Sequence, residues 1–164
     1  MMNTNVNAGV NILESLLCNE VLVCSVLAYF LAQFIKIFTT LYREKTFDFK
    51  RLLGAGGMPS SHSSSVCALA FSVARVMGVG SPVFALCVVL AGVVMYDATG
   101  VRREAGTHAK MLNQIIKDIF SGDPVYAQTA LKELIGHTPM QVVMGALLGT
   151  VIGLFFPSLA PLFA

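Results

Sequence analysis

The chain has 164 residues, of which 55% are hydrophobic and 12% are charged, and its mean hydropathy is +0.74. Because a soluble domain carries about 25% charged residues, this composition excludes an ordinary soluble protein and predicts a single integral membrane domain over residues 1–164. A net charge of only +2 gives nucleic-acid binding no electrostatic support. The four cysteines lie singly in or beside apolar runs, so we expect small buried side chains, no metal site and no disulfide pattern.

Four apolar runs predict membrane-spanning helices, each of which needs about 20 mostly apolar residues. In chain order they are Val21–Tyr42, Ser63–Val79, Pro82–Asp97 and Met140–Phe163. The last run repeats glycine at Gly145, Gly149 and Gly153. A four-residue spacing of small residues allows two helices to approach closely.

Between the third and fourth runs, His108–Phe120 has the pattern of an amphipathic helix. The apolar side consists of Met111, Leu112, Ile115, Ile116 and Ile119. The polar side consists of Lys110, Asn113, Gln114 and Lys117. We expect this helix to lie at the membrane interface or to cover the bundle. The predicted fold is therefore an all-α polytopic membrane bundle of about four transmembrane helices plus an amphipathic interfacial helix.

His108 falls within the apolar stripe of that helix. Its position is typical either of a core histidine with one hydrogen-bond partner or of a histidine that faces a shared polar pocket.

Basic residues are distributed unevenly between the two sides of the predicted domain. The long polar connections Arg43–Gly57 and Gly100–Pro139 share one side, and with Lys36 they hold ten of the eleven Lys and Arg residues. Only Arg75 is left for the other side. The positive-inside rule predicts that the basic side is cytoplasmic and that both termini lie outside. We expect the protein to be located in the cytoplasmic membrane, or in an organelle membrane if the source is a eukaryote.

The stretch GGMPSSHSSS, Gly56–Ser65, precedes the second run on the basic side. Pro59 suits a helix start, and Ser60, Ser61 or Ser63 can cap that helix. The free amides and the positive dipole end of a helix start favour an anion such as phosphate, close to His62. The same residues are equally typical of a serine-capped membrane helix after a flexible loop.

Further polar groups follow the third run, in the sequence MYDATGVRREAGTHAK. Asp97 lies at the edge of the apolar run, where an ionised carboxylate is usually paired. Arg102 and Arg103 suit bidentate phosphate binding, or they anchor the helix end beside a salt-bridged Asp97. Lys36 either snorkels to the interface or points into a polar cavity. All of these residues lie on the same predicted side.

Two motifs, GGMPSSH (Gly56–His62) and DATGVRREAG (Asp97–Gly106), resemble the divergent branch of the type 2 phosphatidic acid phosphatase superfamily, which includes vanadium-dependent haloperoxidases. The resemblance extends to KELIGHTP (Lys132–Pro139) and into the glycine-rich last helix. It implies the helical-bundle fold and a phosphatase that uses neither metal nor cofactor.

The superfamily has three signatures, and this chain departs from each. In the first, Lys36 and Arg43 match with six residues between them, but Glu44 replaces a proline. In the second, Pro-Ser-Gly-His, Ser61 replaces the glycine.

The third signature is Ser-Arg, five residues, His, three residues, Asp. Arg102 and His108 match, while Val101 replaces the serine and Leu112 replaces the aspartate. That aspartate orients the nucleophilic histidine in the superfamily, and Asp97 is the preferred substitute here.

The resemblance implies a mechanism in which the third-signature histidine attacks phosphorus and the second-signature histidine protonates the leaving oxygen. By position, His108 is the nucleophile and His62 the general acid. The phosphate-binding residues are Lys36, Arg43, Ser60, Ser61, Arg102 and Arg103. Two alternatives stay open: His62 is itself the nucleophile, oriented by Asp97, or His137, beside the Thr138-Pro139 cap of the last helix, enters the site.

The predicted function is a membrane-embedded phosphatase that hydrolyses a lipid phosphomonoester at the cytoplasmic face through a phosphohistidine. Its expected partners are the lipid phosphate substrate and the bilayer, with no nucleic acid and with homo-oligomerisation left open. The alternative is a catalytically inactive, anionic-lipid-binding or scaffold membrane protein of the same fold. A small transporter that uses Asp97 and Lys36 as an intramembrane pair is a third interpretation.

Overall fold

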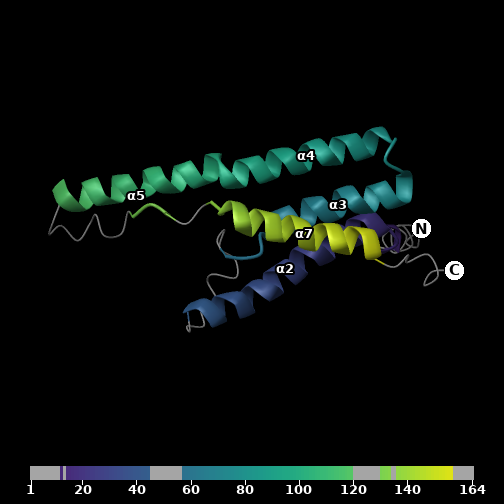
Figure 1. Ribbon diagram of the computed structural model, residues 1–164, viewed down its shortest axis with the longest axis horizontal. Coiled ribbons are helices and arrows are strands. Elements are labelled where there is room, and N and C mark those ends of the chain that lie inside the picture. The colour runs from purple at the N-terminus through teal and green to yellow at the C-terminus, as the bar shows by residue number, and fades with distance from the viewer. Residues whose placement is uncertain (1–11, 13, 45–56, 120–129, 134–135, 157–164) are drawn as a thin grey trace, which may run out of the picture.

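A computed structural model describes residues 12, 14–44, 57–119, 130–133 and 136–156 of the chain (Figure 1). The main elements are α2 (Glu20–Glu44), α3 (Ser61–Met77), α4 (Pro82–Thr99), α5 (Val101–Ile119) and α7 (Pro139–Phe155). No strand occurs among the described residues, so the all-α prediction is confirmed. The predicted runs match these helices to within a few residues, except that α7 ends at Phe155 whereas the predicted run continued to Phe163.

The central element is α3, which packs against α7, α2 and α4. Its buried face is made of small side chains: Ser61, Ser63, Ser64, Cys67, Ala68, Ala70, Ser72 and Val73. Hydroxyls on this face bond to the backbone of α2. Ser64 Oγ donates to the Ala28 carbonyl at 3.1 Å, and Ser65 Oγ donates to the Ser25 carbonyl at 3.2 Å. Small residues and satisfied hydroxyls therefore let α2 lie close to α3.

The glycines of α7 form its contact with α3. A Cβ at Gly145 or Gly149 would overlap the carbonyl of Ser60 or Ser64, respectively. A Cβ at Gly153 would lie 2.8 Å from the Ala68 carbonyl oxygen. The predicted close helix contact is confirmed, and it requires glycine because the α3 backbone occupies the side-chain space.

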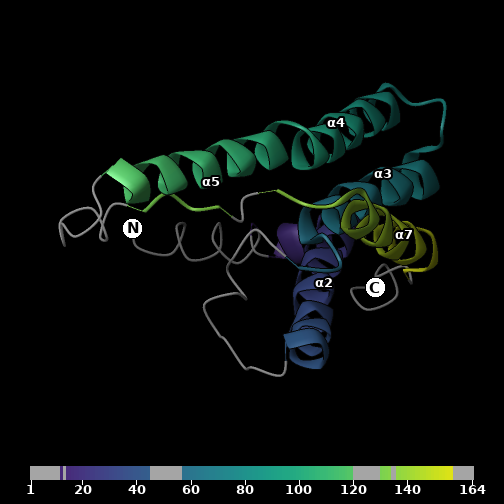
Figure 2. The same cartoon turned by 60° about the vertical axis from the view of Figure 1, so that its left-hand side comes forward.

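A nearly continuous rod is formed by α4 and α5 (Figures 1 and 2). The amide of Gly100 donates to Tyr96 O at 2.8 Å, and that of Glu104 donates to Gly100 O at 2.9 Å. Helical hydrogen bonding therefore continues through the junction. The sequence-based boundary was wrong here, because residues assigned to a connection before His108 belong to α5.

Both views show α5 extending beyond α3 and α7. Its apolar side chains Met111, Leu112, Ile115 and Ile119 are exposed. This exposure fits a helix at the membrane interface and not a helix that covers the bundle. The segment 130–133 returns along α5, where Asn113 and Leu131 exchange two hydrogen bonds of 2.9 Å.

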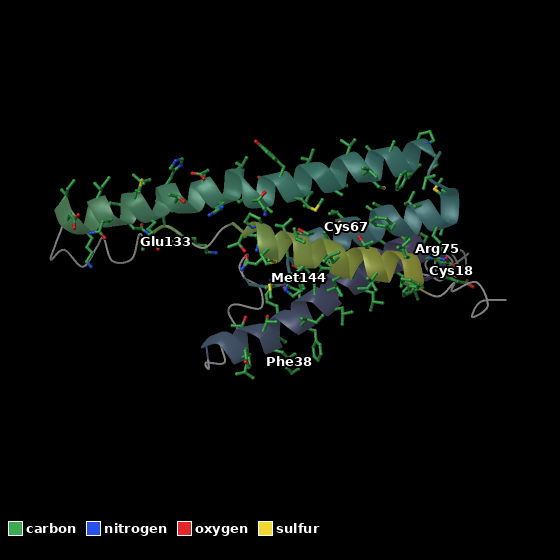
Figure 3. The ribbon with its side chains drawn as sticks, viewed as in Figure 1. Cys18, Phe38, Cys67, Arg75, Glu133 and Met144 are labelled. Atoms are coloured by element: carbon green, nitrogen blue, oxygen red, sulfur yellow. The ribbon has the colours of Figure 1, made fainter. Side chains whose placement is uncertain are left out.

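Two described helical stretches are long and apolar enough to cross a membrane, Glu20–Tyr42 and Pro82–Ile119, and α7 is a shorter apolar helix. Large apolar side chains face outward from the bundle, among them Phe38 on α2 and Met144 on α7 (Figure 3). An uncovered apolar surface of this kind suits lipid. The chain is thus a helical membrane bundle.

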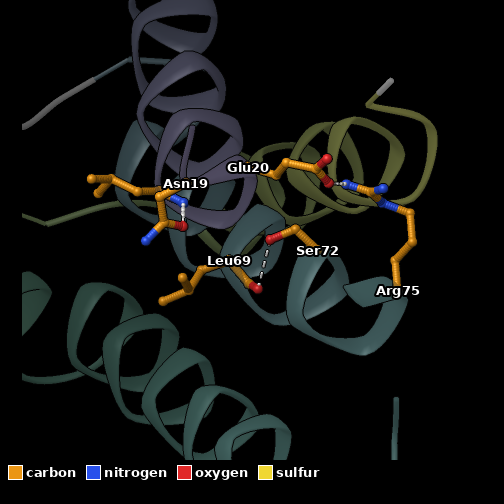
Figure 4. A network of polar contacts seen from close by, with 6 residues as sticks. Asn19, Glu20, Leu69, Ser72 and Arg75 are labelled. Carbon is orange, nitrogen blue, oxygen red and sulfur yellow. Dashed lines mark hydrogen bonds and ion pairs between the residues drawn. The ribbon is translucent and has the colours of Figure 1, made fainter. Parts of the chain in front are cut away.

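The end of the bundle that contains the start of α2 is closed by an ion pair (Figure 4). Arg75 Nη2 lies 3.3 Å from Glu20 Oε2, joining the last turn of α3 to the first turn of α2. Asn19 Oδ1 accepts the Leu22 amide at 3.1 Å and caps α2. Arg75 therefore lies at the opposite end of the bundle from Lys36, which is about 24 Å further along α2.

Candidate active site

Four helix ends meet at the Lys36 end of the bundle. Thr39 Oγ1 of α2 donates to the Met58 carbonyl at 2.5 Å, just before α3. The Ser60 amide donates to the Gln141 carbonyl of α7 at 3.0 Å. The His137 amide donates to the Ala98 carbonyl of α4 at 3.0 Å. These bonds join segments that are far apart in the sequence, and they bring the C-terminal parts of α2 and α4 to the starts of α3 and α7.

The N-cap of α3 is Ser60, one of the three predicted serines. Its Oγ accepts from the Ser63 amide at 3.4 Å and from Ser63 Oγ at 3.0 Å, and both residues are fully buried. The Ser60 hydroxyl acts as the acceptor in both bonds, so neither of them uses its own hydrogen. Ser61 begins the helix and is also buried.

Lys36 is 4% exposed and is the most unusual charge in the bundle. Gly57, at φ +95°, lies against its stem, where a Cβ would be 2.9 Å from Lys36 Cγ. Among the described residues, no carboxylate pairs with this ammonium. The burial favours the polar-cavity interpretation over snorkelling. A buried ammonium without a counter-charge is costly, so an anion is its natural partner.

His62 occupies the first turn of α3, and its side chain is exposed. Its ring packs edge-on against Tyr29, with ring centroids 5.8 Å apart and planes at 79°. Lys36 and Arg102 are close enough to act electrostatically on its imidazole. The charges of Lys36 on α2 and Arg102 on α5 therefore both act on His62 at the start of α3.

Asp97 forms an ion pair with Arg102, with Oδ2 and Nε 2.5 Å apart. The two side chains are 33% and 48% exposed, respectively. The structure thus gives Asp97 the salt-bridged arrangement that the sequence offered as one interpretation. Because the bond uses Nε, the terminal amino groups of the Arg102 guanidinium remain for an anion. Among the described residues, Asp97 forms no hydrogen bond or ion pair with a histidine.

His108 lies six residues beyond Arg102 and is exposed on α5. Within the described part of the chain it makes no hydrogen bond, ion pair or ring contact. It is not the core histidine with one hydrogen-bond partner that the apolar stripe also suggested. Its assignment as nucleophile therefore rests on the motif alone and stays a prediction.

The structure gives no contact with an anion site for the side chains of two further predicted phosphate ligands, Arg103 and Arg43. The Arg103 side chain is exposed, and its backbone lies against Gly136, where any Cβ would overlap it. The side chain of Arg43 lies outside the described residues.

The sequence offered His137 only as an alternative site residue. In the structure its side chain is buried, with 5% of its surface exposed. Its Nδ1 lies 3.3 Å from Gln141 Oε1. Burial lowers the pKa of His137 below its usual value; the Gln141 hydrogen bond opposes this, and the charges of Lys36, His62 and Arg102 add to it. His137 therefore binds a proton less readily than an ordinary histidine.

One sequence signal could have located His137 more firmly. Thr138 is the N-cap of α7, Pro139 lies in the first turn, and Gln141 completes a capping box. That motif fixes the residue before the cap relative to the helix start. What it does not reveal is which other helix ends surround that residue.

Within the described residues, no group of His, Cys, Asp and Glu side chains is suited to hold a metal ion.

The model of the Divergent PAP2 family matches residues 17–152, a range that includes every helix of the site. The chain belongs to the Divergent PAP2 family. It is also 38% identical over 149 residues to the uncharacterized membrane protein YuiD of Bacillus subtilis (strain 168), covering 85% of this chain and 94% of that protein. No solved structure matches this Divergent PAP2 chain significantly.

Proposed function

We propose that this Divergent PAP2 protein is a membrane-embedded phosphatase that hydrolyses a lipid phosphomonoester at the cytoplasmic face. The observation that carries the proposal is the buried ammonium of Lys36, which no described carboxylate neutralises. Its stem lies against Gly57, just before α3, and its charge and that of Arg102 both act on His62. A phosphate dianion supplies the missing negative charge.

The surrounding donors suit phosphoryl transfer. The start of α3 contributes helix-terminal amides and the buried hydroxyls of Ser60 and Ser61, which favour an anion. Lys36 and Arg102 stabilise the charge that spreads over the equatorial oxygens in the transition state. Arg43 and Arg103 are the additional ligands that the motifs assign. His62 is the general acid that protonates the leaving oxygen.

The outer surface accounts for a lipid substrate. Exposed apolar side chains cover α2, α4 and α7, so acyl or isoprenoid chains stay in the bilayer while the headgroup enters between the helix ends. The cytoplasmic orientation follows from the charge asymmetry, because ten of the eleven basic residues belong to the predicted side of the site. Arg75 lies at the opposite end of the bundle.

One observation favours a second candidate, an inactive anionic-lipid-binding or scaffold protein. Leu112 replaces the carboxylate of the third signature, and both Leu112 and His108 are exposed. The same cationic pocket would then hold a lipid phosphate without cleaving it.

Purified protein in nanodiscs, incubated with phosphatidic acid, phosphatidylglycerophosphate or an isoprenoid phosphate, distinguishes the two candidates. The phosphatase releases inorganic phosphate, and Lys36→Met abolishes the release while Lys110→Met, on the exposed polar side of α5, leaves it unchanged. Binding of these lipids without release supports the scaffold. If Lys36→Met still bound these lipids and released phosphate as the wild type does, the proposed site would be contradicted.

A further inference from the structure

Tyr29 and Gln33 lie one turn apart on α2 and are joined by a hydrogen bond. Gln33 Nε2 donates to the Tyr29 hydroxyl at 3.2 Å. Both residues are half-buried in a helix that is otherwise largely apolar. Lys36 follows on the same helix, roughly 5–10 Å further along its axis. A pair of polar side chains therefore lies close to the proposed phosphate site, on the side towards the middle of α2.

The side chain of Gln33 is not explained by its contribution to stability. Its Oε1 is buried and has no hydrogen-bond partner among the described residues. A buried polar atom that stays unpaired destabilises a fold, so an apolar side chain would be the more stable choice at this position. Within the described structure, the hydrogen bond that the Gln33 side chain makes is the one to Tyr29. What Gln33 does is therefore to fix the Tyr29 side chain.

The ring of Tyr29 in turn contacts the imidazole of His62. The ring centroids are 5.8 Å apart and the planes meet at 79°, an edge-to-face geometry that aromatic rings prefer. His62 is exposed, and an exposed side chain exchanges among several staggered rotamers. A contact of this kind shifts such an equilibrium by about two- to tenfold. Tyr29 therefore favours one orientation of the His62 ring.

We propose that Tyr29 is the positioning residue of His62 and that Gln33 holds Tyr29 in place. This inference rests on the proposed function, in which His62 is the general acid. Proton transfer requires the N–H of the imidazole to lie about 2.6–3.2 Å from the leaving oxygen. As the bond from phosphorus to the lipid oxygen breaks, its electron pair stays on that oxygen and takes the proton of His62. Tyr29 exchanges no proton and acts only on the direction of the imidazole.

The dependence of the rate on the leaving group tests the proposal. Protein in nanodiscs is given phosphatidic acid, whose leaving group is an alcohol, or an amphiphilic nitrophenyl phosphate, whose leaving group departs without a proton. Tyr29→Leu should lower kcat for phosphatidic acid about tenfold with little change in KM, and should leave the nitrophenyl phosphate rate within about twofold. Tyr42→Leu, on the same helix and 88% exposed in the wild type, is the control and should change neither rate.

Two further variants separate a positioning ring from a proton donor. Tyr29→Phe keeps the ring against His62 and should retain most of the activity on phosphatidic acid, whereas a tyrosine that itself gave the proton would lose as much in Tyr29→Phe as in Tyr29→Leu. In a His62→Ala background, Tyr29→Leu should cost nothing further, because its effect passes through His62. A second tenfold loss in that background contradicts the proposal.

Gln33→Leu keeps the proposal testable if Tyr29→Leu does not fold. This variant removes the bond that holds Tyr29, so it should slow phosphatidic acid hydrolysis and leave both the nitrophenyl phosphate rate and the affinity for vanadate unchanged. Its Tm should not fall, because the buried unpaired oxygen is removed as well. A lower Tm with equal losses for both substrates would make Gln33 a structural residue and would overturn its assigned role.

The outcomes separate the two proposals. Equal losses for the two substrates in Tyr29→Leu overturn the positioning role and leave the phosphatase intact. Absence of phosphate release from either substrate by the wild type overturns the proposed function and the role of Tyr29 with it. If the wild type hydrolyses phosphatidic acid alone, the comparison of Tyr29→Phe with Tyr29→Leu and the His62→Ala background decide.

Discussion

The aliphatic stem of Lys36 occupies the space that a side chain at Gly57 would need. A Cβ at Gly57 would lie 2.9 Å from Lys36 Cγ and 3.0 Å from Cδ, and the backbone there has φ +95°. Gly57 thus allows the loop before α3 to close over the buried lysine. The relationship links the glycine-rich start of the second motif to the first-signature lysine, which the sequence places 21 residues earlier.

Gly57→Ala should weaken anion binding through Lys36. Left-handed backbone costs a non-glycine residue about 1–2 kcal/mol, so this variant should lower stability by about that amount. Gly78→Ala is the matched control, because Gly78 has φ +81° and an added Cβ there would meet nothing within 4 Å. Both variants should lose similar stability in thermal unfolding, but only Gly57→Ala should lose vanadate affinity. Equal vanadate affinity in both variants would falsify the role assigned to Gly57.

Lys36→Met should lower kcat/KM by at least about 100-fold, as expected for loss of a charge that stabilises the transition state. The same variant should raise Tm in the absence of phosphate, because it removes a buried ammonium that no described carboxylate pairs with. Thermal unfolding with and without phosphate measures both effects. A lower Tm without phosphate would indicate that Lys36 is a structural residue.

Gly149→Ala should destabilise the bundle by at least about 2 kcal/mol, because its Cβ would overlap the Ser64 backbone. Gly92→Ala is the matched control on α4, where nothing lies within 4 Å of the added methyl group. That control should raise stability by about 0.5–1 kcal/mol through the helix preference for alanine. Unfolding in denaturing detergent compares the two variants. Equal stabilities would contradict the close contact between α3 and α7.

The lowered pKa of His137 predicts a pH dependence of stability. Because the folded chain holds this proton less tightly than the unfolded chain, the contribution is present above the usual pKa of 6.5 and is lost as pH falls below it. Wild-type protein should therefore lose more stability than His137→Gln as the pH falls from 7 to 5. Parallel losses in the two proteins would show that His137 titrates normally.

Cysteine labelling checks the orientation of the bundle. In a background without the native cysteines, His62→Cys and Arg102→Cys should react with an impermeant reagent from the cytoplasmic side. Arg75→Cys, at the opposite end of the bundle, should react from the other side. If positions 62 and 102 were labelled from opposite sides, the phosphate site would not exist.

The local features of the fold could be predicted from the sequence. Apolar runs located the helices, and the Thr138-Pro139 pair marked the start of α7. The glycine spacing of α7 predicted the close contact with α3. Each of these features depends on residues only a few positions apart, where backbone geometry and hydrogen bonding act directly. The uneven charge distribution was likewise readable without coordinates.

Tertiary packing decided which polar groups meet. Periodicity placed His108 on an apolar face, but it could not show that α5 extends past the other helices and leaves that face uncovered. His137 bonds to Ala98, 39 residues earlier, and its neighbours come from α2, α3 and α5. Such contacts depend on how closely small residues let α3 approach α2 and α7, which is a property of the assembled bundle. Local sequence patterns therefore specified the helices, whereas helix packing specified which polar side chains of different helices come together.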